Sequence, residues 1–528
     1  MQSEQYRLGI DFGTTYSCVA TWKDGGIIVI PNSIGERTSP SVVIFESPTK
    51  FYVGEETLNH LSNDVSVKIY EIKRLIGKSY DQIKDIISYF PFKIIKEKNG
   101  NNPMIQMTFE NNQKLELYPE QIVTLILRKL IKNAESFLNR TIREVLITVP
   151  ADFSELQKKA VKNAVEVIDD IRLLKVINEP TAAILAYGFP KNQLKNILFP
   201  FNKYFTKKSP KIAHPMEETT LSTNSDQTQS NSEYNNDNEN LFRSTFKIQN
   251  KELTRILVVD LGGGTYDVTI VEIENSLNFE SKASAGNQRL GGSDFDKKLM
   301  DYCITEFINK NYAYLDQNKI KNNYKCMQRL KRACEETKKF LSIKSEDIIA
   351  IENFYDKKNL VCKITRAKFE DLCKDLFDKL TIPLDKVLQE ANIKNENIDE
   401  IIFVGGSCLI PKVKEIIQSK FPNVPINDKI SPDEAVAFGA AICAESPRRT
   451  EGEFWENFSF RDKTQHSYGI ETADGKMEVI IQKGIKYPIT KKKYFHNVYN
   501  NQLTFDLKIL EGENKLAKDN EIIGEFTL

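Results

Sequence analysis

Apolar and polar residues follow two patterns along the chain, one typical of strands and one typical of helices. Short apolar runs typical of strands occur within residues 8–20 and 256–271, where a tight turn joins each pair of runs, and again at residues 144–149. Residues 120–139 carry apolar side chains at helical spacing, and a second helix is expected over residues 154–168, where a serine favours the helix N-terminus. This order of strands and helices predicts a layered α/β architecture.

The two tight turns share one design. The first runs from Asp11 to Thr15, and the second runs from Asp260 to Asp267 and holds three consecutive glycines. Glycines leave backbone N–H groups bare, so a polyphosphate can approach them closely, and the flanking aspartates stand where the metal ion of a nucleotide would bind. Either turn alone also fits an ordinary glycine-rich hairpin. Two turns of one design favour a duplicated fold whose two lobes face one nucleotide.

Two further strand ends lead into helices. The strand ending near Asn178 turns into a helix at Pro180, and the strand at residues 401–404 leads into a Gly-Gly-Ser turn. Bare backbone at that turn can receive a purine or ribose edge. Residues 431–437 begin another helix, with a proline and two acidic residues in its first turn.

The pattern breaks at residues 190–254. Between residues 217 and 240 every side chain belongs to Ser, Thr, Asn, Gln, Asp or Glu, except Leu221 and Tyr234. Such a segment buries too little apolar surface to offset the entropy of ordering it. We expect a disordered insertion at a surface turn, with a binding loop as the alternative interpretation.

The last part of the chain changes character again. Residues 448–463 are charged and aromatic without a helical period, which predicts a linker between domains. Residues 464–528 show the alternation of antiparallel β structure, although this region is short for an independent β domain.

Composition narrows the functional classes. A chain of 528 residues is long enough for two or more domains, and its 73 basic residues balance its 73 acidic ones. No overall field therefore attracts nucleic acid or a membrane, and no apolar run has the length of a membrane span. Eight scattered cysteines without a CxxC pair, together with only four histidines, favour reduced thiols and argue against zinc. The polar N-terminus is unlike a signal peptide, so we expect a cytoplasmic or nuclear protein.

Several longer motifs carry a family resemblance. GIDFGTTYSCVA, KRLIG, VPADF, INEPTAAILAYG, DLGGGTYDVTI, LGGSDFD, VGGS followed by IPKV, and SPDEAVAFGAA occur in this order. Together they resemble the 70-kDa heat-shock protein (DnaK-type) chaperone family over residues 6–447, apart from the insertion, and less cleanly over 464–528. The resemblance implies an actin-like (ribonuclease H-like) two-lobed α/β ATPase domain. Its parts would be residues 1–189 and 255–447, followed by the linker and a truncated, partial antiparallel β substrate-binding segment.

The resemblance also implies an activity. The family binds ATP, hydrolyses it slowly and couples ATP/ADP exchange to the binding of unfolded or nascent polypeptides. Mg²⁺ with K⁺ alongside would be the cofactors, and J-domain co-chaperones and nucleotide exchange factors would be the partners. The alternative is a lidless co-chaperone or ribosome-associated platform that binds ATP but hydrolyses little. A sugar kinase or filament-forming actin relative shares the hairpins but does not explain INEPTAA, VPADF or TQHSYGIET.

Carried over by motif, the resemblance assigns site residues. Lys73 would position the attacking water, with Asp260 or its neighbours accepting the proton. Glu179 would orient a metal-bound water, and Thr265 would hydrogen-bond the γ-phosphate. Metal coordination would fall to Asp11, Asp260 and Asp267. The remaining nucleotide-binding positions would be Gly13, Thr14, Thr15, Tyr16, Gly262, Gly263, Gly264, Glu335, Lys338, Lys339, Ser342, Gly405, Gly406, Ser407 and Asp433.

The chain also departs from the family pattern. Lys339 and Leu409 stand where the family has two arginines that sandwich the adenine, which predicts weaker nucleotide binding or an altered base preference. Lys158 replaces an arginine that the family uses in interlobe signalling. Residues 457–463 stand where the family carries an Asp-flanked leucine run that docks on the ATPase domain.

A further departure concerns the β segment. Residues 464–528 match only the first strands of the peptide-binding sandwich, without its remaining strands and lid. Ala473, Val498 and Phe505 correspond to the peptide cleft, and Phe505 is larger than its usual counterpart. We therefore do not expect high-affinity, lid-clamped client binding.

Overall fold

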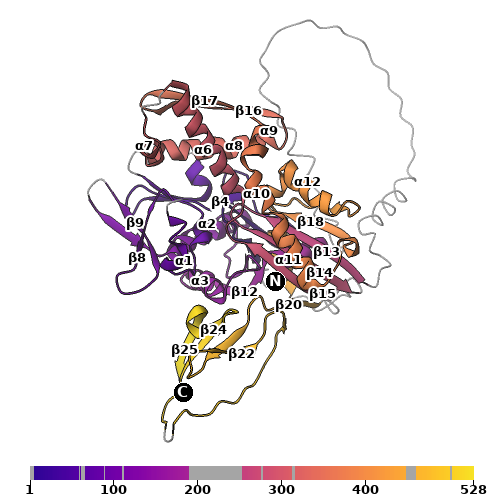
Figure 1. Ribbon diagram of the computed structural model, residues 1–528. Coiled ribbons are helices and arrows are strands. Elements are labelled where there is room, and N and C mark those ends of the chain that lie inside the picture. Colours follow the sequence, from indigo (N-terminus) through magenta and orange to yellow (C-terminus); the bar gives the residue numbers. More distant parts are fainter. Residues whose placement is uncertain are drawn as a thin grey trace, which may run out of the picture.

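Two α/β lobes stand side by side above a small β unit in the computed structural model of the chain (Figure 1). The structure describes residues 5–58, 60, 66–87, 90–109, 112–188, 253–274, 278–311, 315–427, 429–446, 459–499 and 502–528. Most of the insertion expected at 190–254, and the first part of the expected linker, therefore lie outside the described residues. Within the described part, every helix is too short or too polar to cross a lipid bilayer.

Each lobe is built on one mixed sheet. The first sheet contains β1 (Arg7–Asp11), β2 (Tyr16–Lys23), β3 (Gly26–Val29), β4 (Thr38–Pro40), β11 (Glu144–Val149) and β12 (Arg172–Asn178). The second sheet contains β13 (Leu253–Leu261), β14 (Tyr266–Glu274), β15 (Asn278–Asn287), β18 (Glu400–Val404), β19 (Ile426–Asn427), β20 (Ser459–Lys463) and β23 (Lys486–Tyr487).

The two sheets repeat one pairing scheme. In the first lobe, β1 pairs antiparallel with β2 and parallel with β11, which in turn pairs with β12. In the second lobe, β13 pairs antiparallel with β14 and parallel with β18, which in turn pairs with β19. The strand order β12-β11-β1-β2-β3 thus matches β19-β18-β13-β14-β15. This repeat agrees with the actin-like fold class and explains why the two hairpin turns have one design.

Two apolar helices join the lobes. α4 (Glu179–Gly188) and α13 (Ala435–Glu445) pack against each other, and their alanines and isoleucines are buried among strands of both sheets. The approach is very close, because a Cβ atom added to Gly439 would lie 1.6 Å from the Ala182 carbonyl oxygen. Small residues at this crossing therefore fix how near the lobes stand.

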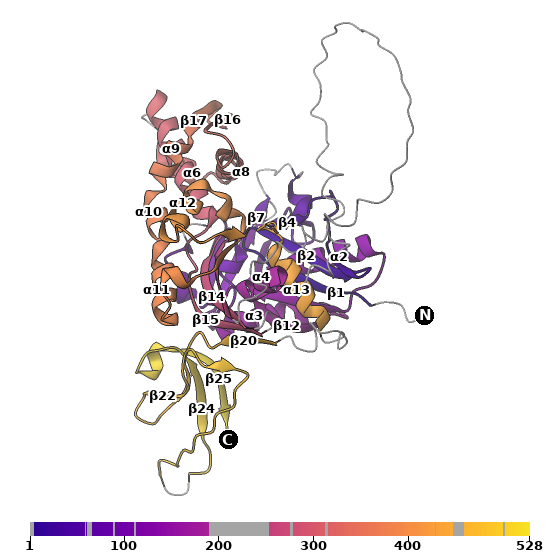
Figure 2. The same ribbon diagram turned by 90° about the vertical axis from the view of Figure 1, so that its right-hand side faces the viewer.

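Other elements surround these sheets (Figure 2). On the first lobe they are α1 (Tyr80–Ile83), α2 (Pro119–Leu138), α3 (Glu155–Glu166), β5 (Val43–Phe45), β6 (Phe51–Val53), β7 (Val67–Ile69), β8 (Lys93–Lys96), β9 (Pro103–Thr108) and β10 (Lys114–Leu117). On the second they are α6 (Gly292–Asn311), α7 (Gln317–Lys321), α8 (Tyr324–Leu341), α9 (Arg366–Leu372), α10 (Lys374–Asp378), α11 (Thr381–Ala391), α12 (Pro411–Lys420), β16 (Glu346–Tyr355) and β17 (Lys358–Thr365). The predicted N-terminus of α3 is confirmed, because the Ser154 side chain accepts a hydrogen bond from the Gln157 N–H.

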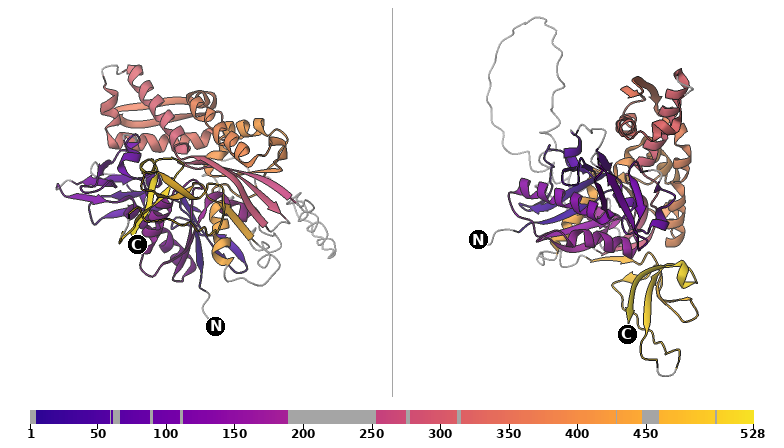
Figure 3. Two further views of the ribbon diagram at one scale, coloured as in Figure 1. Left: turned by 60° about the horizontal axis from the view of Figure 1, so that its bottom comes forward. Right: turned by 90° about the vertical axis from the view of Figure 1, so that its left-hand side faces the viewer.

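The C-terminal residues form a separate antiparallel sheet, here called the β unit (Figure 3). Its strands are β21 (Tyr468–Glu471), β22 (Met477–Ile481), β24 (Asp506–Glu511) and β25 (Glu521–Thr527). Met477, Leu510 and Ala517 form its small core.

The positions matched to a peptide cleft lie on the β unit but do not share one environment. Ala473 lies exposed in the turn between β21 and β22, and Val498 is 62% exposed. Phe505 is half-buried, and its backbone exchanges two hydrogen bonds with Leu528. Their part in peptide binding stays a prediction.

The β unit is attached to the lobes by a strand and by polar contacts. β20, which lies within the expected linker, pairs in parallel with β15. Next to it, Asn178 donates a hydrogen bond to Asp462 over 2.6 Å. The Glu155 N–H at the start of α3 donates to Glu511 over 2.8 Å, and Lys158 lies one turn away on the same helix. Glu511 is only 4% exposed, and burial raises its pKa to about 7.

The crossing of α4 and α13 makes a first prediction about stability. Gly439→Ala should lower the free energy of unfolding by about 3 kcal/mol, because the new methyl group overlaps the Ala182 carbonyl. Urea denaturation measures the change. Gly524→Ala in β25 is the matched control, since its nearest neighbour is a side-chain atom at 3.7 Å, and equal losses in the two variants would contradict the prediction.

Glu511 makes a second prediction, about pH. A raised pKa means that the folded protein binds this proton more tightly than the unfolded chain, whose carboxyl has the ordinary pKa of 4.5. The free energy of unfolding should therefore fall as the pH rises from about 4.5 through about 7. Glu511→Gln keeps an acceptor and removes the charge, so it should be more stable than wild type at about pH 8, by about 2 kcal/mol.

Urea denaturation at about pH 5 and about pH 8 tests this difference. The exposed Glu116→Gln variant is the control. If Glu511→Gln followed the same pH dependence as wild type, Glu511 would not be the titrating group.

Candidate functional site

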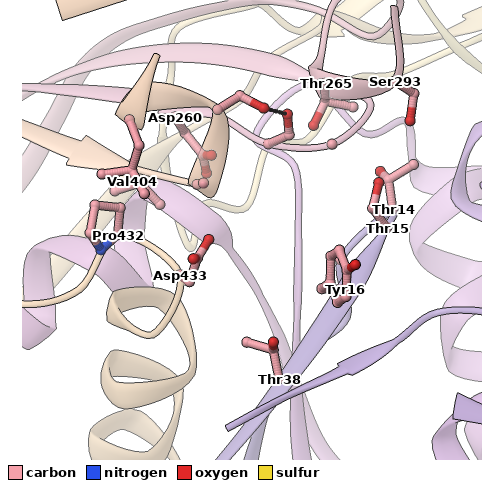
Figure 4. Close-up of a pocket in the computed structure, with 18 of the residues that line it drawn as sticks. Thr14, Thr15, Tyr16, Thr38, Asp260, Thr265, Ser293, Val404, Pro432 and Asp433 are labelled. Carbon is pink, nitrogen blue, oxygen red and sulfur yellow. Dashed lines mark hydrogen bonds between the residues drawn. The ribbon is translucent and has the colours of Figure 1, made fainter. Parts of the chain in front are cut away.

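A cavity of about 580 Å³ opens between the two lobes and is lined from both. The residues around it that were predicted from the sequence are Asp11, Gly13, Thr14, Thr15, Tyr16, Lys73, Glu179, Asp260, Gly262, Gly263, Thr265, Glu335, Lys338, Lys339, Ser342, Gly405, Gly406, Ser407 and Asp433. Figure 4 shows Thr14 and Thr15 facing Thr265 across its upper part, with Asp260 and Asp433 on the opposite side from Tyr16. Gly264 and Asp267 were predicted too but lie behind this lining.

The two hairpins touch through residues that must be small. A Cβ atom on Gly263 would lie 1.9 Å from the Thr15 hydroxyl oxygen, and one on Gly264 would lie 2.5 Å from the Thr14 methyl carbon. The second turn is closed by a hydrogen bond from the Gly262 N–H to the Thr265 carbonyl, 3.0 Å long. The glycines therefore have two effects. They leave backbone N–H groups accessible, and they allow the opposing turns to come into contact.

Lys73 lines the cavity and is held in place by two acceptors. It lies in a short 3₁₀ helix, Ile72–Arg74, and is only 3% exposed. Its Nζ donates to the Phe12 carbonyl oxygen over 2.5 Å and forms an ion pair with Glu179. A buried ammonium held by two acceptors has a defined direction, so it can face a negatively charged group in the cavity.

Four carboxyl groups gather around this lysine. Burial, and next the Glu179 charge, raise the pKa of Asp11 to about 7. Burial also raises the pKa of Asp260 well above its usual range, with Glu179 and Asp11 adding to the effect. The pKa of Asp267 is also raised, mainly by burial and next by the charge of Asp152. Such a group of carboxyl groups favours a cation or a shared proton.

The carboxylates suit a hydrated divalent cation. Both side-chain oxygens of Asp267 are buried without a hydrogen-bond partner, as expected of groups that hold water or an ion. Within the described ranges, no three His, Cys, Asp or Glu side chains converge closely enough to bind a metal directly. Mg²⁺ usually keeps several waters and binds through phosphate oxygens, so the residues present fit that ion.

The outer end of the cavity lies between α8 and the loops of both sheets. The Tyr16 hydroxyl of the first lobe donates to Glu335 of α8 over 2.8 Å. Lys338 donates to the Gly292 carbonyl over 2.9 Å and pairs with Asp296. Gly405 takes a φ of +79°, which brings the turn after β18 against the Leu261 carbonyl. These contacts leave backbone and polar side chains around an elongated cavity.

Comparisons with known proteins agree with this geometry. The family model described as Hsp70 protein matches residues 7–201 and 245–528. Heat shock cognate 70 kDa protein 3 of Dictyostelium discoideum is 34% identical over 523 residues, which are 99% of this chain and 73% of the relative. The chain belongs to the Hsp70 family.

Two fungal relatives are similar over the same span. Heat shock 70 kDa protein 2 of Paracoccidioides lutzii is 33% identical over 524 residues, 99% of this chain and 70% of the relative. A heat shock 70 kDa protein of Neurospora crassa is 33% identical over 524 residues, covering 99% of the chain and 71% of the relative. Members of the Hsp70 family are in general ATPases and chaperones that bind nucleotide with Mg²⁺, unfolded polypeptides and co-chaperones.

Some lining residues were not predicted. Gly292, Ser293 and Asp296 belong to the LGGSDFD motif, and their position at the start of α6 was a usable signal. The cavity also borders on Cys18, Thr38, Ile343, Val404, Ile410, Pro432 and Val436. Nothing in the sequence around Thr38 or Ile343 marks them, because only the folded chain brings them to the cavity.

The unpartnered carboxyl group of Asp267 makes a third prediction. Asp267→Asn should raise the unfolding free energy of the ligand-free protein at neutral pH by about 2 kcal/mol, because a neutral amide escapes the cost of burying a carboxylate. The same change should reduce the extra thermal stability given by ATP with Mg²⁺. Thermal unfolding with and without ligand measures both effects.

Asp506→Asn at an exposed position is the control. A ligand-free Asp267→Asn variant less stable than wild type would show that the carboxylate itself holds the fold together.

Proposed function

We propose that this chain is an ATP-dependent molecular chaperone that hydrolyses ATP slowly and couples nucleotide state to the binding of unfolded polypeptides. The supporting observation is the buried Lys73, directed by Phe12 and Glu179 into a cavity where two glycine hairpins meet. The nucleotide-binding domain would comprise residues 1–189 and 255–447. We also propose the cytoplasm or nucleus as its location, since all eight cysteines are free thiols.

The hydrolytic step needs charge neutralisation and the alignment of water. Lys73 would lie against the γ-phosphate and position the attacking water, while the Thr265 hydroxyl would hydrogen-bond the same phosphate. Asp260, which lines the cavity, or one of its neighbouring carboxylates would take the proton from that water. In-line placement in a polar site accounts for phosphoryl transfer without a covalent nucleophile.

Mg²⁺, when bound, would neutralise the phosphate charge, with K⁺ alongside. Asp11, Asp260 and Asp267 would hold its waters, and Glu179 would orient one of them. Backbone N–H groups of the hairpins from Gly13 to Tyr16 and from Gly262 to Gly264 would bind the phosphate oxygens.

The nucleoside would occupy the outer end of the cavity. Glu335, Lys338 and Ser342 on α8 would contact the ribose and the base edge. Gly405, Gly406, Ser407 and Asp433 would border the other side, where the Ser407 hydroxyl already donates to the Gly262 carbonyl over 2.9 Å. This arrangement suits one extended nucleotide that touches both lobes.

Coupling to polypeptide binding would run through the attachment of the β unit. β20 extends the sheet that carries the second hairpin, and Glu511 contacts the first lobe through the Glu155 N–H. A relative movement of the lobes would alter both contacts. J-domain co-chaperones and nucleotide exchange factors are the expected partners in this cycle.

A second candidate function is a platform that binds ATP with little hydrolysis. The observation that favours it is the outer end of the cavity, where Leu409 and Lys339 replace two stacking arginines. The buried pair of Lys73 and Glu179 favours the chaperone ATPase instead.

Single-turnover hydrolysis separates these functions and makes the fourth prediction. Lys73→Ala should slow ATP hydrolysis by about 100-fold or more, because it removes the directed charge beside the γ-phosphate. Lys73→Met, which fills the buried space, guards against a simple loss of folding, and the exposed Lys162→Ala is the control. Wild-type protein as slow as Lys73→Ala, with and without a J-domain, would favour the platform.

A further inference from the structure

A row of charged residues on α8 faces the first lobe. Lys331, Glu335 and Lys339 follow one another at intervals of one helical turn. The Lys331 Nζ lies 2.5 Å from a Glu71 oxygen and 3.6 Å from the centroid of the Tyr70 ring. One turn later, Glu335 accepts the hydrogen bond of Tyr16. The row thus holds α8 against the first lobe along the mouth of the cavity.

Lys339 is already engaged at the end of this row. Its Nζ lies 2.7 Å from Glu335 and 3.2 Å from the Tyr16 hydroxyl, which accepts its hydrogen bond. It also lies 4.5 Å from the centroid of the Tyr16 ring. Because Lys339 contacts a carboxylate, a hydroxyl and an aromatic ring at the same time, its ammonium group is directed away from a stacking position on a nucleotide base.

Aliphatic side chains form other parts of the cavity wall near Lys339. Leu409, in the short 3₁₀ helix Gly406–Leu409, lines the cavity with 57% of its surface exposed. Ile343 follows the end of α8, also lines the cavity, and is 83% exposed. Aliphatic contact depends on the area of a base and hardly on its ring substituents.

The polar group beside them, the Ser342 hydroxyl, also discriminates little between adenine and guanine. Ser342 lines the cavity between Ile343 and α8, and its hydroxyl donates only a long hydrogen bond, 3.5 Å, to the Lys338 carbonyl of its own helix. A ligand acceptor can replace that long bond, so the hydroxyl can donate to a ligand or accept from it. It therefore suits both the amino group of adenine and the carbonyl group of guanine. Sites that reject a ligand strongly, by about 10⁴-fold, do so by leaving committed buried polar groups unpaired, whereas apolar pockets discriminate by only about 10- to 200-fold.

We propose that the base subsite formed by Leu409, Ile343, Ser342 and the pinned Lys339 accepts purine nucleoside triphosphates with little discrimination between adenine and guanine. The proposal rests on the proposed function, which makes the cavity a nucleoside triphosphate site. Affinity would come mainly from the phosphates and ribose, and the base would contribute through its apolar face. The absence of the two arginines would thus relax the base specificity of this chain.

Equilibrium binding of ATP and GTP, each with Mg²⁺, tests the proposal on the full chain. The wild-type dissociation constants should differ by about 30-fold at most. Leu409→Arg should tighten ATP binding by about 5- to 30-fold, because a guanidinium above the base adds a cation–π contact. Ile382→Arg adds the same side chain at an exposed position outside the cavity lining, and should change neither constant.

The outcomes separate the two proposals. A wild-type preference for ATP above about 30-fold would overturn relaxed base selection while leaving the ATPase proposal intact. Leu409→Arg with unchanged affinity, in a variant that melts like wild type, would show that the base does not contact this wall. If neither ATP nor GTP bound to any variant, the proposed function itself would fail.

Discussion

Contact between two opposed hairpin turns sets the geometry of this molecule. Gly263 and Gly264 lie directly against the side chains of Thr15 and Thr14, so the loop that follows β13 has no room for side chains at these two positions. The same small-residue rule holds deeper in the structure, where Gly439 of α13 meets the Ala182 carbonyl of α4. Close contacts at glycine residues thus determine the spacing of the lobes in two places. The cavity, the position of Lys73 and the carboxyl groups around it all depend on that spacing.

Charge burial is the main energetic cost of this arrangement. Asp11, Asp260 and Asp267 carry raised pKa values chiefly because they are buried, and the positive charge of Lys73 compensates only in part. A protein normally avoids such a concentration of carboxyl groups unless a ligand uses it. Under the proposed function, the ligand-free state loses stability in exchange for the ability to bind a phosphate and its cation. This trade is expected at sites where binding and hydrolysis require preorganised charge.

Much of the fold followed from local patterns in the sequence. The two hairpins, α2, α3 and the strand before Gly405 were all predictable, because apolar periodicity, turn glycines and a serine N-cap act over a few residues. Site residues were instead assigned by the resemblance of whole motifs to the Hsp70 family, which periodicity alone does not provide. Thr38 and Ile343 were not, since tertiary packing alone brings them to the cavity. Cross-lobe partners such as Tyr16 and Glu335 likewise lie more than three hundred residues apart, beyond the reach of any local signal.

Pairing between β20 and β15 has a consequence for how the chain can vary. Parallel strand pairing uses backbone amides and carbonyls, which every residue except proline provides in the same way. The segment from Ser459 to Lys463 can therefore pair with β15 although its composition is far from a run of leucines. Attachment at this point tolerates sequence drift, whereas the polar contacts of Asp462 and Glu511 do not. A divergent linker sequence and strand pairing with β15 are thus compatible within one chain.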